Sequence, residues 1–225
     1  MSFMFTAFFI GNIASGKSSA TRYLASKGAV RLDLDQMAKE LYVPGSALLG
    51  SLSDEFGADV LDEEGCVRNA VLAERAFATP ERSARLDAIV YPALLDTLKD
   101  VLADLDTGHI DPGNFIVIED SNAVGFKESL VLADEVVAIS ASPAIRRERA
   151  LGRGMALEDF EARAAVQPSD EELCSFADTI IDNSSSVEEL ERQLDAWMRE
   201  RGIGLCATRI VRPGGSVGNV GDVRD

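Results

Sequence analysis

The feature that most constrains the fold of this chain is a glycine-containing turn that joins an apolar run to a helix-forming segment. Residues 8–20 read FFIGNIASGKSSA, and Gly11 to Ser18 match the pattern GxxxxGK[ST]. By chance, about one chain in a hundred of this length would match it. Residues 3–10 are a nearly continuous hydrophobic run, typical of a central parallel strand, and residues 18–27 favour a helix that Gly28 can end. The sequence therefore predicts a phosphate-binding loop between a strand and a helix.

This loop has the chemistry to hold a nucleoside triphosphate. Its backbone amides and those of the helix N-terminus converge on one concavity, where they can bind phosphate oxygens. Lys17 would bridge the β and γ phosphates, and the Ser18 hydroxyl would ligate Mg²⁺. We predict that the loop and the first helical turn bind ATP or GTP through Gly11, Asn12, Ile13, Ala14, Ser15, Gly16, Lys17, Ser18 and Ser19.

The remaining strand patterns predict an α/β fold. Four further short runs have the composition of strands: residues 29–33, 115–120, 134–140 and 179–182. The first of these follows the predicted helix directly and completes a strand–helix–strand unit. Such a unit implies a parallel sheet with a right-handed crossover.

Two regions have a helical period. Between Gln36 and about Leu105 the apolar residues recur as on one helical face, and we expect Pro92 to divide this region into two helices or to kink one. A closing helix is expected to pack on the sheet through Val187, Leu190, Leu194 and Trp197. The glycine-rich end of the chain, residues 204–225, has no amphipathic period and is predicted to be a disordered tail.

Charge and composition narrow the possible partners. The net charge of −16 repels nucleic acid and anionic lipid, so neither is an expected partner. The opening apolar run is about eight residues, far short of the roughly 20 that span a bilayer. Three distant cysteines lack metal-ligand spacing. We expect a cytoplasmic protein with reduced thiols, present as a monomer or a weak homo-oligomer.

Among nucleotide-binding proteins, a small kinase fits best. The guanine-recognition tetrapeptide NKxD of GTPases is absent from the sequence, and the chain is too short for a motor ATPase, although one strand ends in Glu119-Asp120. A kinase needs a base for the acceptor hydroxyl. Asp33 and Asp35 end the second strand, at the sheet edge where ligands bind. We predict that Asp35 is this base; the alternative is an N-cap for a helix that begins at Gln36.

A charged, helical segment between the last two strands is interpreted as a lid. Arg146, Arg149 and Arg153 are three and four residues apart, so they share one helical face and could neutralise charge on the transferred phosphoryl group. The alternative is a solvated helix whose arginines pair with neighbouring glutamates.

The order of motifs resembles the dephospho-coenzyme A kinase family. GNIASGKSS is followed by RLDLDQMAKELYVPG, DEFGADVLDEEG, AERAF, a strand ending in Asp120, RALGR with AAVQ, and ADTIIDN, and the resemblance runs from about Phe5 to Trp197. It implies a P-loop kinase with a five-stranded parallel sheet flanked by helices, a helical acceptor-binding insertion and a lid. It also implies that ATP phosphorylates the ribose 3′-hydroxyl of dephospho-coenzyme A, the last step of coenzyme A synthesis.

The resemblance also implies domain boundaries and residue roles. The nucleotide-binding core would comprise residues 1–35 and 114–203, with a lid over about 143–175, and residues 36–113 would form the acceptor-binding subdomain. Asp35 stands at the position of the family's base. Lys17 and Arg149 would assist the transfer, and Arg149 and Arg153 match the RxxxR motif of the family's lid. Arg146 stands where that lid usually has a glutamine, but because it shares a helical face with the other two arginines we expect it, like Arg153, to contact ATP. Asn183 lies in the loop where the family contacts the adenine.

Departures from the family pattern concentrate in the acceptor half. Tyr91-Pro92 stands where His-Pro is usual, Asn69 replaces an arginine, and the segment after the third strand has Asn122-Ala123-Val124 in place of Pro-Leu-Leu. The altered contacts either hold the family's substrate or select a different hydroxyl. A nucleoside or nucleotide kinase of the same fold is the alternative enzyme, and a nucleotide-binding regulator that has lost transfer is the alternative from another class.

Overall fold

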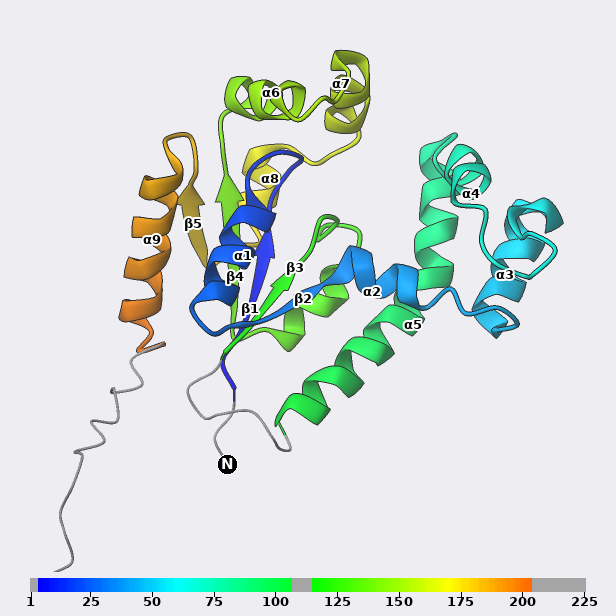
Figure 1. Ribbon diagram of the computed structural model, residues 1–225, viewed down its shortest axis with the longest axis horizontal. Helices are drawn as coiled ribbons and strands as arrows, with labels where there is room; N and C mark the ends of the chain where they lie inside the picture. Colours follow the sequence, from blue (N-terminus) through cyan, green and yellow to red (C-terminus); the bar gives the residue numbers. More distant parts are fainter. Residues whose placement is uncertain (1–3, 107–114, 204–225) are drawn as a thin grey trace, which may run out of the picture.

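The chain folds around one five-stranded parallel sheet, as Figure 1 shows. The structure, a computed structural model, describes residues 4–106 and 115–203, so the tail predicted at 204–225 lies outside it. The sheet order is β2-β3-β1-β4-β5, and every pairing is parallel. The strands are β1 (Thr6–Ile10), β2 (Val30–Asp33), β3 (Ile116–Glu119), β4 (Glu135–Ser140) and β5 (Thr179–Asp182). The predicted α/β fold class is thus confirmed.

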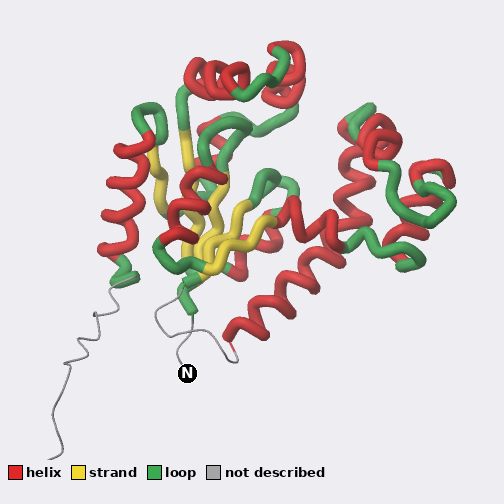
Figure 2. The backbone as a smooth tube through the Cα atoms, in the orientation of Figure 1, coloured by secondary structure: helices red, strands yellow, loops and turns green. Residues whose placement is uncertain are grey.

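Helices cover both faces of the sheet, as Figure 2 shows, which explains why its central strand is apolar throughout. Phe9 points to the face covered by α1 (Lys17–Ser26) and α9 (Val187–Glu200), where it meets the Trp197 ring edge-on at 5.5 Å between centroids. Phe8 points to the opposite face, which α5 (Pro80–Asp106) helps to cover. The predicted closing helix is confirmed, except that Val187, the first residue of the helix, is 61% exposed.

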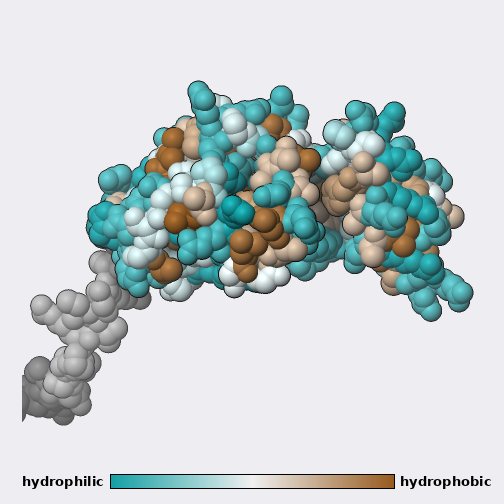
Figure 3. All heavy atoms as spheres, turned by 90° about the horizontal axis from the view of Figure 1, so that it is seen from above, coloured by the Kyte–Doolittle hydropathy of each residue, from teal (hydrophilic) through white to brown (hydrophobic). Residues whose placement is uncertain are grey.

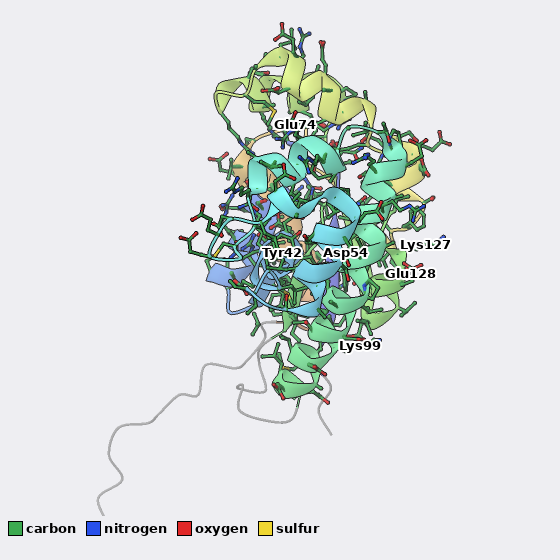
Figure 4. The ribbon with its side chains drawn as sticks, turned by 90° about the vertical axis from the view of Figure 1, so that its right-hand side faces the viewer. Tyr42, Asp54, Glu74, Lys99, Lys127 and Glu128 are labelled. Carbon is green, nitrogen blue, oxygen red and sulfur yellow. The ribbon has the colours of Figure 1, made fainter. Side chains whose placement is uncertain are left out.

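The segment between β2 and β3 is a helical lobe. It contains α2 (Leu34–Glu40), α3 (Ala47–Phe56), the 3₁₀ turn η1 (Ala58–Val60), α4 (Asn69–Ala76) and α5. Its buried residues Leu49, Leu52, Phe56, Leu72 and Val90 form a small core of their own. Figure 4 faces this lobe, with Asp54, Glu74 and Lys99 exposed on it.

Pro92 does not divide the long helix of this lobe. Helix α5 is continuous from Pro80 to Asp106, so of the two expected outcomes the division into two helices is wrong and the single helix with a kink remains. In Figure 1 the two halves of α5 run in different directions, as expected of a helix that contains a proline. None of the helices in the described ranges combines the length and apolarity that crossing a membrane requires.

The segment between β4 and β5 forms the helices above the carboxyl ends of the strands. These are α6 (Pro143–Gly152), α7 (Leu157–Ala165) and α8 (Asp170–Cys174); η2 (Lys127–Leu132) precedes β4. Ser142 caps α6 by accepting a hydrogen bond from the Ile145 amide, and Pro143 occupies the first helical position. Figure 3 shows a hollow between this part of the molecule and the helical lobe, on the side where the strands end.

Candidate active site

The predicted phosphate loop joins β1 to α1 and is built around two glycines. Gly16 has a φ of 107°, and a Cβ there would lie 2.0 Å from the Asn183 amide nitrogen. A Cβ on Gly11 would lie 2.5 Å from the Ile139 carbonyl oxygen. Both positions therefore require glycine. Ala14 has a φ of 59° and is the one non-glycine residue with positive φ in the described part of the chain.

Asn183, which follows β5, holds this loop through hydrogen bonds. Its buried side-chain amide donates to the Ser15 carbonyl at 2.7 Å, and its oxygen accepts from Arg149 at 3.4 Å. The amide thus contacts both the loop and the segment that carries Arg149. We call this segment, the predicted lid with helices α6 to α8, the arm. The adenine contact expected at Asn183 from the family resemblance stays a prediction.

Lys17 lies buried at the start of α1 among acidic groups. Burial lowers the pKa of its ammonium, an effect that the charges of Glu119, Asp120 and Asp35 oppose. The ammonium donates to the Gly11 carbonyl within the loop. A lysine at a helix N-terminus, next to the backbone amides of the loop, is placed to bind phosphate oxygens.

Glu119, at the end of β3, links the phosphate loop to the second strand. It accepts hydrogen bonds from the Ser18 hydroxyl and, at 2.8 Å, from the Thr21 hydroxyl. Arg31 donates to Glu119 at 2.6 Å and to Asp33 at 2.8 Å. The sequence showed this acidic pair at a strand end, but the partners of Glu119 lie on α1 and β2, and only the fold brings them together.

Asp35 lies exposed in the first turn of α2 at the same edge of the sheet. Asp33, not Asp35, caps this helix, since its carboxylate accepts from the Gln36 amide at 3.2 Å. The N-cap alternative for Asp35 is therefore wrong. The Ser121 hydroxyl lies 2.8 Å from both Asp35 carboxylate oxygens and donates to them. The carboxylate is held at the site and remains open to a ligand.

Asp120 is a second carboxylate at this edge, and it is buried. Its Oδ1 accepts from the Asn122 amide at 2.7 Å, whereas its Oδ2 has no hydrogen-bond partner. Burial raises its pKa to about 6, and the nearby Asp35 charge adds to the rise while Lys17 opposes it. Nothing in the sequence distinguishes the role of Asp120 from that of Glu119.

Two of the departures from the family pattern, at Tyr91 and in the segment after β3, contact each other. The Asn122 side-chain amide donates to the Tyr91 hydroxyl, and Phe126 stacks on the Tyr91 ring with centroids 4.4 Å apart. Burial raises the pKa of Tyr91, as do the charges of Asp87 and Asp120. Residues from α5 and from the loop after β3 thus form one connected cluster, which a residue-by-residue reading of the sequence could not show.

The arm after β4 contacts the phosphate loop at several points. The Gln167 side-chain oxygen accepts from the Ile13 amide at 2.8 Å, and the Asn12 amide donates to Asp170 at 2.7 Å. Arg146, predicted to face ATP, is buried and pairs with Asp170 at 3.2 Å.

The other two arginines of the arm also lie against the loop. Arg149 donates to the Ser15 carbonyl at 3.4 Å and to the Ser185 carbonyl at 3.3 Å. Arg153 is exposed and lines the same concavity as Lys17 and Ser18. The structure therefore brings all three predicted arginines to the nucleotide side of the sheet edge.

Comparison with known proteins identifies related sequences and folds. Residues 8–189 match the family model described as dephospho-CoA kinase. A dephospho-CoA kinase of Streptomyces avermitilis is 35% identical over 189 residues, covering 83% of this chain and 89% of the relative. A solved structure from Thermus thermophilus has a TM-score of 0.71 at 28% identity, covering 88% of this chain and 97% of that one. The dephospho-CoA kinase of Campylobacter jejuni shares the fold, with a TM-score of 0.63 at 22% identity, covering 87% of this chain and 96% of its own.

Proposed function

We propose that Asp35, Lys17 and Arg149 catalyse the phosphoryl transfer in this protein. The chain belongs to the dephospho-CoA kinase family, and it therefore phosphorylates dephospho-CoA with ATP in the last step of coenzyme A biosynthesis. The observation that supports this assignment is the position of Asp35. Its exposed carboxylate lies at the edge of the sheet where Lys17 and the phosphate loop also lie, and the Ser121 hydroxyl fixes its orientation.

In the proposed reaction, the ribose 3′-oxygen attacks the γ-phosphorus of ATP. The 3′ O–H bond breaks and its proton passes to the Asp35 carboxylate, an O–P bond forms, and the bond between the γ-phosphorus and the bridging oxygen breaks to release ADP. The Lys17 ammonium neutralises charge on the β and γ phosphates as it builds up on the bridging oxygen. The loop amides hold the phosphates in line with the acceptor.

The arginines of the arm would stabilise the same charge from the opposite side. Arg149 reaches the Ser15 carbonyl of the loop, and Arg153 lines the concavity, so both guanidinium groups are placed to meet phosphate oxygens when ATP binds. The buried Arg146 is paired with Asp170, and we propose that it positions the arm as well as contacting ATP. The contacts of Gln167 and Asn12 bring the arm onto the loop.

The residues around Ser18 fit the Mg²⁺ that such transfers use. The Ser18 hydroxyl gives its hydrogen to Glu119, which leaves the hydroxyl oxygen's lone pairs for a hard cation. The proposed ligands are the Ser18 hydroxyl and phosphate oxygens of ATP. When bound, Mg²⁺ would neutralise phosphate charge and orient the phosphates.

The helical lobe of α2 to α5 would bind the acceptor, since it borders the hollow opposite the arm. This is the proposed role of residues 36–113, of which 107–113 lie outside the described structure. A cytoplasmic location and a monomeric or weakly associating state complete the proposal.

The test is a coupled ATP-consumption assay with Mg²⁺ and, separately, dephospho-CoA, adenosine, nucleoside monophosphates or no acceptor, with products identified by mass spectrometry. We expect turnover only with dephospho-CoA and a 3′-phosphorylated product. Asp35→Asn should lower kcat by at least about 100-fold with little change in ATP binding, whereas Asp54→Asn, on the outer face of the lobe, should leave kcat unchanged. Near-normal turnover by Asp35→Asn would show that Asp35 is not the base. Turnover with another acceptor would indicate that the cluster of Tyr91, Asn122 and Phe126 determines the acceptor specificity.

A further inference from the structure

Unpartnered polar atoms mark the places where a buried side chain awaits a ligand. In the described part of the chain, three buried side-chain atoms lack a hydrogen-bond partner: Ser15 Oγ, Asp120 Oδ2 and Arg146 Nε. Ser15 and Arg146 belong to the loop and the arm on the ATP side. Asp120 is the one carboxylate among the three, and the proposed mechanism gives it no task. Because an unpartnered buried carboxylate oxygen is unfavourable, its presence points to a partner that arrives with a ligand.

The surroundings of Asp120 place it on the acceptor side of the phosphates. It directly precedes Ser121, whose hydroxyl holds the Asp35 carboxylate at 2.8 Å. Its Oδ1 accepts from the backbone N–H of Asn122, and the side chain of Asn122 donates to the Tyr91 hydroxyl on α5. Asp120 thus belongs to the short segment that connects the proposed base to the helical lobe. The charges of Asp35 and Lys17 also act on Asp120.

The chemistry of the acceptor supplies a matching donor. The reacting ribose carries two neighbouring hydroxyls on the same face of the ring, at C2′ and C3′. When the 3′-hydroxyl meets Asp35, the 2′-hydroxyl is its immediate neighbour and needs an acceptor of its own. An ionised carboxylate can only accept hydrogen bonds, so a second carboxylate beside the first suits a pair of adjacent hydroxyls.

We propose that Asp120 Oδ2 accepts a hydrogen bond from the ribose 2′-hydroxyl of the acceptor and so directs phosphorylation to the 3′-position. Asp120 is then a specificity-determining residue that contacts the substrate, while Asp35 takes the proton. No covalent step occurs at Asp120. This inference rests on the proposed function, because it requires a ribose as the acceptor and Asp35 as the base.

The substitution Asp120→Asn tests this assignment with little change in shape. The backbone N–H of Asn122 requires an oxygen at the position of Oδ1. The side-chain nitrogen of the new asparagine therefore takes the place of Oδ2, and it cannot accept a hydrogen bond from a hydroxyl. Kinetics of both enzymes are measured with dephospho-CoA and with its 2′-deoxyribose counterpart, and products are mapped by NMR. Asp178→Asn is the matched control, since Asp178 also caps a strand end by accepting from a backbone amide, at Val136.

We expect kcat/KM of the unaltered enzyme to fall about 10- to 100-fold when the 2′-hydroxyl is removed, as for a hydrogen bond to a charged group. Asp120→Asn should show a similar loss with dephospho-CoA but little further loss with the 2′-deoxy compound, and some 2′-phosphorylated product. Asp178→Asn should show the same ratio of kcat/KM between dephospho-CoA and the 2′-deoxy compound as the unaltered enzyme. If Asp120→Asn lowers kcat/KM equally for dephospho-CoA and for the 2′-deoxy compound, Asp120 does not contact the 2′-hydroxyl. The inference then fails, while the proposed function stands. If the unaltered enzyme does not phosphorylate dephospho-CoA, the proposed function fails and the inference with it.

Discussion

The buried carboxylate of Asp120 should cost the ligand-free protein stability, and its removal should therefore stabilise the fold. Its pKa is raised from 3.8 to about 6, chiefly by burial. A rise of about two pKa units corresponds to on the order of 3 kcal/mol of folding free energy once the group is ionised. Asp120→Asn keeps the hydrogen bond from the Asn122 amide and carries no charge. We expect it to raise the free energy of unfolding by up to about 3 kcal/mol at pH 7.5, or to raise Tm by about 6–12 °C for a chain of this size.

The pH dependence of this effect has a definite sign. Between about pH 4 and pH 6 the folded state retains the Asp120 proton that the unfolded state has released, so the stability of the unaltered protein falls as pH rises through this window. The advantage of Asp120→Asn should therefore be small near pH 4, grow up to about pH 6 and stay constant above it. Urea unfolding followed by circular dichroism at several pH values measures the difference.

Two results would refute this reasoning. A variant that is less stable than the unaltered protein at pH 7.5 would mean that Asp120 ionises without penalty in the folded state. A stability gain that does not change with pH would mean that the gain comes from packing and not from the buried charge. Asp178→Asn is the control, because it removes a carboxylate that already accepts from the Val136 amide at 2.9 Å, and it should not stabilise the fold.

Three further perturbations follow from the structure. Ala14→Gly should relieve the positive φ of 59° and, after the entropy cost of glycine, stabilise the protein by up to about 1 kcal/mol in urea unfolding, with ATP binding retained; a loss of stability would contradict the strain. Arg201→Met should cost about 2–3 kcal/mol, because it leaves the buried Glu135 carboxylate without its guanidinium, and the double variant with Glu135→Gln should recover part of the loss. Burial raises the pKa of Glu135, but the hydrogen bonds from Arg201 and other donors outweigh this effect and hold the pKa below 4.5. The difference in unfolding free energy between Arg201→Met and the unaltered protein should therefore become smaller only as pH falls below about 4.5. Tyr91→Phe keeps the ring stacking but loses the hydroxyl that accepts from Asn122, and steady-state kinetics should show KM for dephospho-CoA raised about 5-fold with KM for ATP unchanged; an effect on ATP alone would contradict an acceptor-side role.

The fold was largely predictable from the sequence because its three central strands, β3, β1 and β4, are buried on both faces. A strand such as Thr6–Ile10 then has no polar alternation, and the glycine turn after it fixes where the first helix begins. Errors arose where local rules compete with the surrounding structure. Pro92 removes one backbone donor, yet packing of α5 on both the sheet and the lobe keeps that helix continuous. Val187 has the helical spacing of the buried face but is the first residue of its helix, and it is exposed there.

The candidate site was predictable only where its residues are close in the sequence. The loop from Gly11 to Ser18 has a fixed spacing, so its position follows from the sequence alone. Glu119 and Arg31 are 88 positions apart and meet only because β2 and β3 are neighbours in the sheet. The roles of the individual site residues stay predictions until the variants above are measured.

The sheet order has a consequence for how the chain is made. The first strand lies between β3 and β4, so its partners are distant: Thr6 pairs with Ile116, and Ala7 pairs with Glu135. At ordinary rates of synthesis, roughly 5–20 s pass between the appearance of β1 on the ribosome and that of its first neighbour. Throughout that interval the apolar strand has no place in a sheet, while the helical lobe, whose contacts are more local, can already form. Nascent chains halted before residue 116 should therefore hold a folded lobe and a first strand that needs shelter from a chaperone.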